Sequence, residues 1–255
     1  MEKSYSIDLN ADLGEGYPFD EQLFQLISSA NIACGGHAGD EKTIRASLRQ
    51  CESLAVAAGA HPSYPDKLNF GRKSMQLDRR ELQNSLRIQL DLFYEIASEE
   101  KIKPHHVKLH GALYNDCFDH EELTLQVLEV LNEYEVDFIY GPSNSKFNQM
   151  ALSRGFQVIH EVFADRAYLS SGKLAPRSME GAVLKEIDSM SQQLRSMLLQ
   201  QELKSMEGET ISLKADTVCL HGDNDHAIQF AKMIRRLLQD WKIEILAPHQ
   251  QNYSG

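Results

Sequence analysis

Acids, histidines and cations recur in this chain directly after short apolar runs, and four of the histidines (His37, His61, His110 and His221) stand beside glycine or proline. Six segments show this pattern: 10–16, 33–40, 59–63, 107–111, 161–166 and 220–223. Carboxylates and imidazoles can exchange protons with a substrate, while lysine and arginine can hold an anionic one. One such segment is a weak signal, but six of them predict an enzyme active site.

The runs that precede these segments predict strands alternating with helices. Apolar or alternating stretches predict strands at 5–10, 30–34, 59–61, 106–110, 136–140, 156–162, 216–221 and 243–246. Apolar residues spaced by three or four predict helices near 20–29, 40–58, 78–100, 119–132, 145–154, 181–200 and 224–239. Such alternation predicts parallel strands joined by crossover helices.

The predicted fold class is therefore α/β. We expect a TIM-like (β/α) barrel of about seven strands, formed by a single domain over residues 1–255. An open, doubly wound sheet is the competing architecture. The polar stretch 201–216 is less regular, and we expect a small excursion there, such as a hairpin.

Parallel topology predicts where the polar segments meet. The carboxyl ends of all strands lie on one side of such a fold, so residues distant in sequence converge there. We expect one cleft at these ends to be lined by Asp12, His37, His61, His110, Asp165 and His221.

Lys108 and His110 should point into the barrel, because the residues that alternate with them are apolar. A buried ammonium group needs an acid close by. Asp8 is the first choice for that partner, since it faces inward on the first predicted strand, and Asp12 is the second.

The loop 35–40 has two interpretations. It could be a tight glycine turn in which Asp40 caps the next helix, or a cradle of backbone N–H groups for an anion. It is not a P-loop, because the pattern G-x-x-x-x-G-K-[ST] has no match here. Elsewhere, His105, His106 and His120 are interpreted as surface or loop histidines.

The composition disfavours several classes of function. The net charge is −11 and lysine and arginine do not cluster, so nucleic acids and anionic membranes are poor partners. No apolar run reaches the ~20 residues needed to cross a bilayer, and the amino terminus has no signal-peptide pattern. The four cysteines are scattered and show no paired C-x-x-C spacing, so we expect reduced thiols and a cytoplasmic protein.

Eight blocks of this sequence resemble the family of 5-oxoprolinase A subunits, also called the LamB/YcsF-like lactam-utilisation family. They are DLNADLGE at 8–15, ANIACGGHAGD at 30–40, GAHPSYPD at 59–66, NFGR at 69–72, HVKLHGALYN at 106–115, EVFADRAY at 161–168, PRS at 176–178 and VCLHGD at 218–223. Three positions depart from the family pattern: Gly36 stands where phenylalanine is common, Leu109 where proline is, and Ala167 where glycine is usual.

This resemblance implies a barrel related to those of glycoside hydrolases and deacetylases. It also implies ATP-dependent opening of 5-oxo-L-proline to L-glutamate, together with partner subunits B and C. ATP, with Mg²⁺, would be bound here or on a partner subunit.

Opening an unactivated lactam needs a general base, groups that hold the substrate carboxylate, and donors for developing oxyanion charge. The candidate catalytic residues are Asp12, His61, His110 and Asp165, with Asp12 or His61 as the base. The candidate substrate-binding residues are Asn10, Glu15, His37, Asp40, Arg72, Lys108, Arg166, Arg177 and His221.

Two other functions remain open. A metal-dependent amidohydrolase or deacetylase would use Asp12, His61 and His110 as ligands of a divalent metal, although the family resemblance implies no metal. A non-catalytic subunit that presents substrate to its partners is the alternative from a different class.

Overall fold

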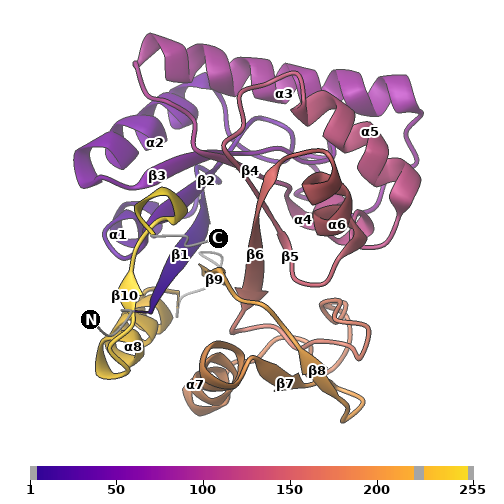
Figure 1. Ribbon diagram of the computed structural model, residues 1–255. Coiled ribbons are helices and arrows are strands. Elements are labelled where there is room, and N and C mark those ends of the chain that lie inside the picture. Colours follow the sequence, from indigo (N-terminus) through magenta and orange to yellow (C-terminus); the bar gives the residue numbers. More distant parts are fainter. Residues whose placement is uncertain (1–4, 221–226, 252–255) are drawn as a thin grey trace.

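Seven parallel strands close into a barrel in the computed structural model, which describes residues 5–220 and 227–251. Their order around the barrel follows the chain (Figure 1): β1 (Ser6–Leu13), β2 (Ser29–Ala33), β3 (Ala57–His61), β4 (His106–Lys108), β5 (Phe138–Pro142), β6 (Gln157–Phe163) and β9 (Thr217–Leu220). The barrel closes because β1 pairs with both β2 and β9. The predicted barrel is confirmed, and the alternative of an open sheet is wrong.

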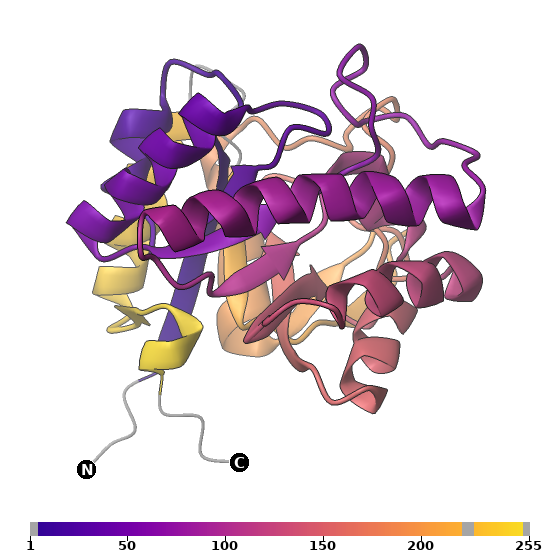
Figure 2. The ribbon, with the colours of Figure 1, turned by 90° about the horizontal axis from the view of Figure 1, so that it is seen from above.

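Helices cover the outside of the barrel. They are α1 (Asp20–Phe24), α2 (Glu41–Leu54), α3 (Arg79–Glu99), α4 (Gly111–Asp116), α5 (Glu121–Leu131), α6 (Lys146–Ser153), α7 (Ile187–Arg195) and α8 (Ala227–Asp240). The long helix α3 runs across one side of the molecule in Figure 2. Its predicted apolar stripe is buried at Leu82, Leu86, Leu90, Phe93 and Ala97. The helix α4 was not predicted, because six residues are too few to show a helical period.

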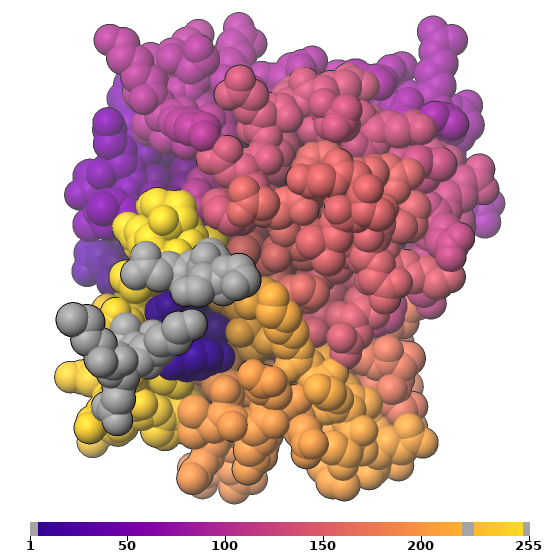
Figure 3. Space-filling view, viewed as in Figure 1, coloured from indigo at the N-terminus to yellow at the C-terminus, as the bar shows by residue number. Residues whose placement is uncertain are grey.

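Three smaller elements complete the fold. The expected excursion is a hairpin of β7 (Glu202–Lys204) and β8 (Thr210–Ser212), which follows a π-helical turn at Ser196–Gln200. Strand β10 (Glu244–Ile245) pairs with the start of β1, and a 3₁₀ turn at Pro248–Gln250 follows it. In Figure 3 the indigo amino-terminal part of the chain is visible between the yellow and orange carboxyl-terminal parts.

The interior of the barrel is polar along β1. Asp8 accepts hydrogen bonds from Ser28, Ser29 and Thr217, at 2.6 to 2.7 Å. Asn10 donates to Thr217 at 2.8 Å. These bonds offset the desolvation of polar groups in the core. No helix within the described residues has the length and apolar character to cross a membrane.

Candidate active site

A cavity of about 590 Å³ opens at the carboxyl ends of the strands. Of the predicted site residues, those that line it are Asp12, Glu15, Arg72, Lys108, His110, Arg166 and Arg177. Apolar side chains form part of its wall, among them Phe118, Phe163 and Leu174. Polar groups that converge on a partly apolar cavity are typical of a small-molecule site.

Lys108 lies at the base of this cavity, between two carboxylates. Its Nζ is 2.9 Å from Asp12 Oδ1 and 2.8 Å from Glu161 Oε1. It also donates to Asn10 Oδ1 at 3.1 Å. The side chain of Lys108 is only 3% exposed. These partners therefore replace the water that would otherwise solvate its charge.

The charges of this group stabilise one another. Burial alone would lower the pKa of Lys108, but Asp12 and Glu161 outweigh it and hold that pKa well above its usual value. Burial alone would likewise raise the pKa of Asp12, but His61 and Lys108 hold it well below its usual value. Asp12 is therefore an ionised carboxylate at neutral pH.

The inward direction predicted for Lys108 is confirmed, but its first-choice partner is wrong. Asp8 lies one layer deeper, where three hydroxyl groups occupy its oxygens. Burial raises the pKa of Asp8, which opposes an ion pair there. The lysine reaches upward instead, to Asp12 and Glu161. Glu161 was missed as a site residue, although it is the one acid in an otherwise mostly apolar run, 156–163.

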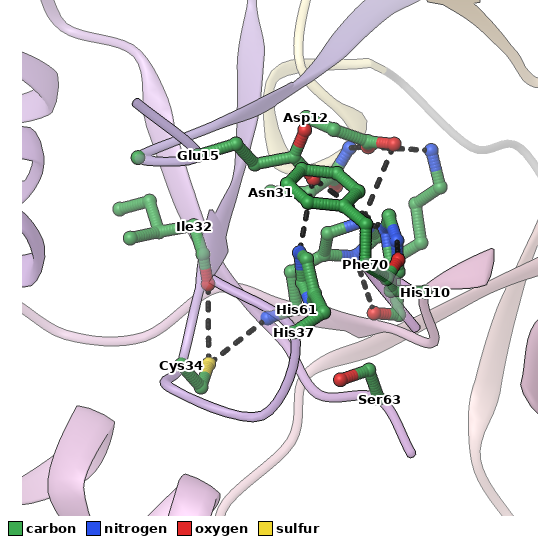
Figure 4. A network of polar contacts seen from close by, with 12 residues as sticks. Asp12, Glu15, Asn31, Ile32, Cys34, His37, His61, Ser63, Phe70 and His110 are labelled. Atoms are coloured by element: carbon green, nitrogen blue, oxygen red, sulfur yellow. Dashed lines mark hydrogen bonds and ion pairs between the residues drawn. The ribbon is translucent and has the colours of Figure 1, made fainter. Parts of the chain in front are cut away.

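Three imidazoles gather beside Asp12 (Figure 4). His37 and His110 stack with their ring centroids 3.6 Å apart. His110 Nδ1 is 3.0 Å from His61 Nε2, and His37 Nε2 is 3.0 Å from Glu15 Oε1. His61 Nε2 also lies 3.3 Å from Asp12 Oδ2. Strands β1, β2, β3 and β4 thus deliver these groups to one point, as the parallel topology predicts.

Burial keeps two of these histidines neutral. It lowers the pKa of His37 to about 3, with the neighbouring His61 acting in the same direction. It also lowers the pKa of His110 well below its usual value, with His37 and His61 adding to the effect. Each of these two imidazoles therefore carries one nitrogen lone pair at neutral pH.

The loop before α3 packs over the histidines. Phe70 has a φ of +55°, a backbone conformation that residues other than glycine rarely adopt. This conformation places its carbonyl 3.0 Å from His110 Nε2, and its ring 5.2 Å from the ring of His37. Backbone strain of this kind is often found at functional sites.

The predicted cations occupy different depths. Arg166 is buried and donates to the carbonyl of Ala175 at 2.6 Å, which anchors the loop after β6. Arg72 lies 5.0 Å over the ring of Phe70, and Arg177 is exposed at the cavity wall. Arg72 and Arg177 are therefore better placed than Arg166 to meet an anionic substrate.

Some predicted residues lie outside the cavity. Asn10 is fully buried beneath Lys108. Asp40 is exposed and caps α2, accepting from the backbone N–H of Thr43 at 2.8 Å, as in the simpler interpretation of its loop. Asp165 is buried after β6 but is not part of the cavity lining. His221 lies outside the described residues.

The interpretation of His106 is wrong, because this residue is buried in strand β4 inside the barrel. His105 lies in the loop before β4 but is buried, and His120 is exposed and caps α5. His106 Nε2 is 2.8 Å from Asn31 Oδ1, and its ring stacks on Tyr140. Alternation places Lys108 inward, and His106 two residues earlier shares that face. The alternation within β4 therefore predicts that His106 is buried, but His106 was interpreted together with its loop neighbour His105.

The departure at Gly36 has a physical reason, and we predict its consequence. A Cβ at this position would overlap the Oε1 atom of Gln89 and lie 2.5 Å from Ser63 Oγ. Gln89 is buried and hydrogen-bonds both backbone groups of Ser63, each at 2.9 Å. Gly36→Ala should therefore lower the free energy of unfolding by about 1–3 kcal/mol, the usual cost of overpacking.

Urea denaturation of Gly36→Ala, Gln89→Ala and the double variant measures this effect. Because Gln89→Ala removes the closer of the two overlaps and leaves only that with Ser63 Oγ, the double variant should be more stable than the sum of the single effects predicts. Strictly additive effects would mean that Gln89 does not occupy the space that the new methyl group needs.

The fold and the cavity define the class of this protein: a parallel (β/α) barrel with a charged site at its strand carboxyl ends. The chain belongs to the LamB/YcsF family, whose family model matches residues 7–253. A protein of Thermococcus sibiricus, named as the A subunit of 5-oxoprolinase, is 40% identical over 247 residues, which cover 94% of this chain and 97% of that one.

Two further relatives agree. A Haemophilus influenzae protein, also named as the A subunit of 5-oxoprolinase, is 40% identical over 242 residues, covering 94% of this chain and 99% of its own. The crystal structure of a lactam utilization protein from Thermus thermophilus superposes with a TM-score of 0.86 at 32% identity. That superposition covers 95% of this chain and 99% of the other.

Proposed function

We propose that this chain is the A subunit of a 5-oxoprolinase and catalyses the ring-opening, hydrolytic part of its reaction. The observation that carries the proposal is the cavity, which is lined by ionised Asp12, neutral His110 and the exposed cations Arg72 and Arg177. The names of relatives that match this chain over almost its full length support the choice of substrate.

The cavity groups fit the chemistry of a small anionic lactam. Arg72 and Arg177 lie at the open side, where each can meet a carboxylate or a phosphate. His110, in its neutral form, can accept a proton from water that attacks the carbonyl carbon. Asp12 is the weaker base because its pKa is so low, and it serves better as a fixed negative charge.

Hydrolysis of an unactivated lactam needs energy from another reaction. We propose that ATP, with Mg²⁺, phosphorylates the lactam oxygen on partner subunits B and C. Water then adds to the activated carbon, the carbon–nitrogen bond breaks as the nitrogen gains a proton, and hydrolysis of the acyl phosphate yields glutamate and phosphate. The absence of a P-loop pattern from the sequence supports the assignment of ATP to a partner.

The isolated chain should release little or no glutamate from 5-oxo-L-proline, with or without ATP. Adding subunits B and C should restore release that depends on ATP. Glutamate and ADP are measured together, because coupling requires both to form. Full turnover by the isolated chain would contradict the division of labour, and no turnover by the three subunits together would contradict the assigned substrate.

A matched pair of variants tests the site within that complex. Asp12→Asn removes a charge at the cavity base, whereas Asp137→Asn removes one from an exposed ion pair with Lys103. We expect Asp12→Asn to lower kcat/KM by about 10²-fold or more, as loss of an acid–base or electrostatic group does. Asp137→Asn should leave it unchanged, and equal effects would place the reaction elsewhere.

A further inference from the structure

The four side chains Glu15, His37, His61 and His110 form a compact set of ligand atoms. One oxygen or nitrogen from each lies within 4.8 Å of all the others. All four side chains are almost entirely buried, and the three histidines come from the end of β3 and from the loops after β2 and β4. The set differs from the metal ligands considered from the sequence, because Glu15 and His37 belong to it while Asp12 stands beside it.

Hydrogen bonds fix which nitrogens of His61 and His110 carry protons. His61 Nδ1 lies 2.8 Å from the carbonyl oxygen of Lys108, and His110 Nε2 lies 3.0 Å from that of Phe70. A carbonyl oxygen can only accept, so each of these nitrogens must donate an N–H. With both imidazoles neutral, as ligation of a metal requires, the lone pairs are on His61 Nε2 and His110 Nδ1.

Those two lone pairs point at each other. His61 Nε2 and His110 Nδ1 are 3.0 Å apart, and His110 Nδ1 is 3.5 Å from Glu15 Oε1. Two lone pairs and a carboxylate at such distances repel one another unless a proton or a metal ion lies between them. The same arrangement leaves each imidazole held from behind by a carbonyl, which is how proteins orient histidine ligands of metals.

From this convergence we propose that Glu15, His37, His61 and His110 bind one divalent metal ion of the zinc type. With bonds of roughly 2.0–2.1 Å, tetrahedral ligand atoms are separated by about 3.3 Å. The neighbouring ligand atoms here are 3.0 to 3.5 Å apart. A site with three nitrogens and one oxygen suits zinc or cobalt, whereas magnesium and calcium prefer oxygen ligands.

The position of the site connects it to the cavity. Glu15 and His110 line the cavity wall, whereas His37 and His61 lie behind it. Asp12 Oδ2, 3.3 Å from His61 Nε2, lies next to the site and can accept a hydrogen bond from a group held there. A metal-bound water would thus face the space proposed for the substrate. The test of metal binding does not depend on the proposed function. An ion on His110 Nδ1 would occupy the lone pair that otherwise accepts a proton from water, and the ion would then activate that water in its place.

Metal content tests the proposal without any enzymatic assay. The purified chain is stripped with a chelator, dialysed, and titrated with zinc and with cobalt. We expect one ion per chain, and the cobalt form should show the visible absorption of a tetrahedral centre. Absence of stoichiometric binding at micromolar metal would overturn the proposal. A proton shared by His61 Nε2 and His110 Nδ1 would then explain why these two atoms lie so close.

Variants locate the ion. Glu15→Gln and His110→Ala should each weaken zinc binding by about 100-fold or more. His120→Asn removes an exposed histidine but keeps a capping residue, so it should bind as the unmodified chain does. Near-ultraviolet circular dichroism checks that each variant is folded. If His110→Ala is unfolded, Glu15→Gln alone decides, and unchanged binding by that variant would overturn the assignment.

Discussion

Replacing Lys108 by methionine should lower the free energy of unfolding by about 3–5 kcal/mol. The lysine is almost fully buried and contacts Asp12 and Glu161 at 2.9 and 2.8 Å. Methionine fills a similar volume, so little of the effect comes from a cavity. The loss arises because two carboxylates would remain buried without their common cation.

Urea denaturation at pH 7.5 measures the effect, and Lys103→Met is the matched control. Lys103 forms an ion pair with Asp137 at 2.6 Å, but on the exposed surface. That variant should change stability by no more than about 1 kcal/mol, as exposed pairs do. A double variant, Lys108→Met with Glu161→Gln, removes one charge from each side and should recover part of the loss. If Lys108→Met is as stable as the control, the buried triad does not stabilise the fold.

The barrel could be predicted because its signals are local. Short apolar runs, such as those of β2 and β3, precede amphipathic helices, and that alternation permits few arrangements. Alternation within β1 and β4 also gives the direction of each side chain, so the inward position of Lys108 followed from sequence alone.

Partners across the barrel could not be predicted in the same way. Which acid Lys108 meets depends on the stagger of the strands, since Asp8 and Asp12 both face inward but lie at different heights. The pairing of His61 with His110 depends on loop conformation, above all on the positive φ of Phe70. The role of Asp40 could not be predicted for another reason. An aspartate before a helix fits both a capping residue and a binding residue, and only the structure shows that it caps α2.

Lowering the pH below about 6.5 should destabilise the chain steeply. Burial lowers the pKa of His37 to about 3 and that of His105 to about 4, and it lowers those of His106 and His110 well below their usual value. In the unfolded chain these four groups take up protons near pH 6.5, while in the folded chain they do not. Stability is therefore fully present above that pH and is lost as the pH falls toward the folded pKa values.

The expected slope is large. Each such histidine contributes up to about 1.4 kcal/mol per pH unit, so four contribute at most about 5.5 kcal/mol per unit. Domains are typically stable by only about 5–15 kcal/mol, and acid unfolding should thus occur well above pH 3. Asp8 and Asp20 act in the opposite direction, because burial raises the pKa of each and so favours its protonated form in the folded chain, but they are two groups against four.

Urea denaturation at pH 7.5, 6.5 and 5.5 gives the slope, with a chelator present because a bound metal would compete with protons. His106→Gln removes one buried imidazole that hydrogen-bonds Asn31. Its slope between pH 6.5 and 5.5 should be smaller by up to about 1.4 kcal/mol per unit. His120→Asn should leave the slope unchanged, since that imidazole is exposed. A stability that is flat across this range would mean that the buried histidines accept protons in the folded chain as readily as in the unfolded one.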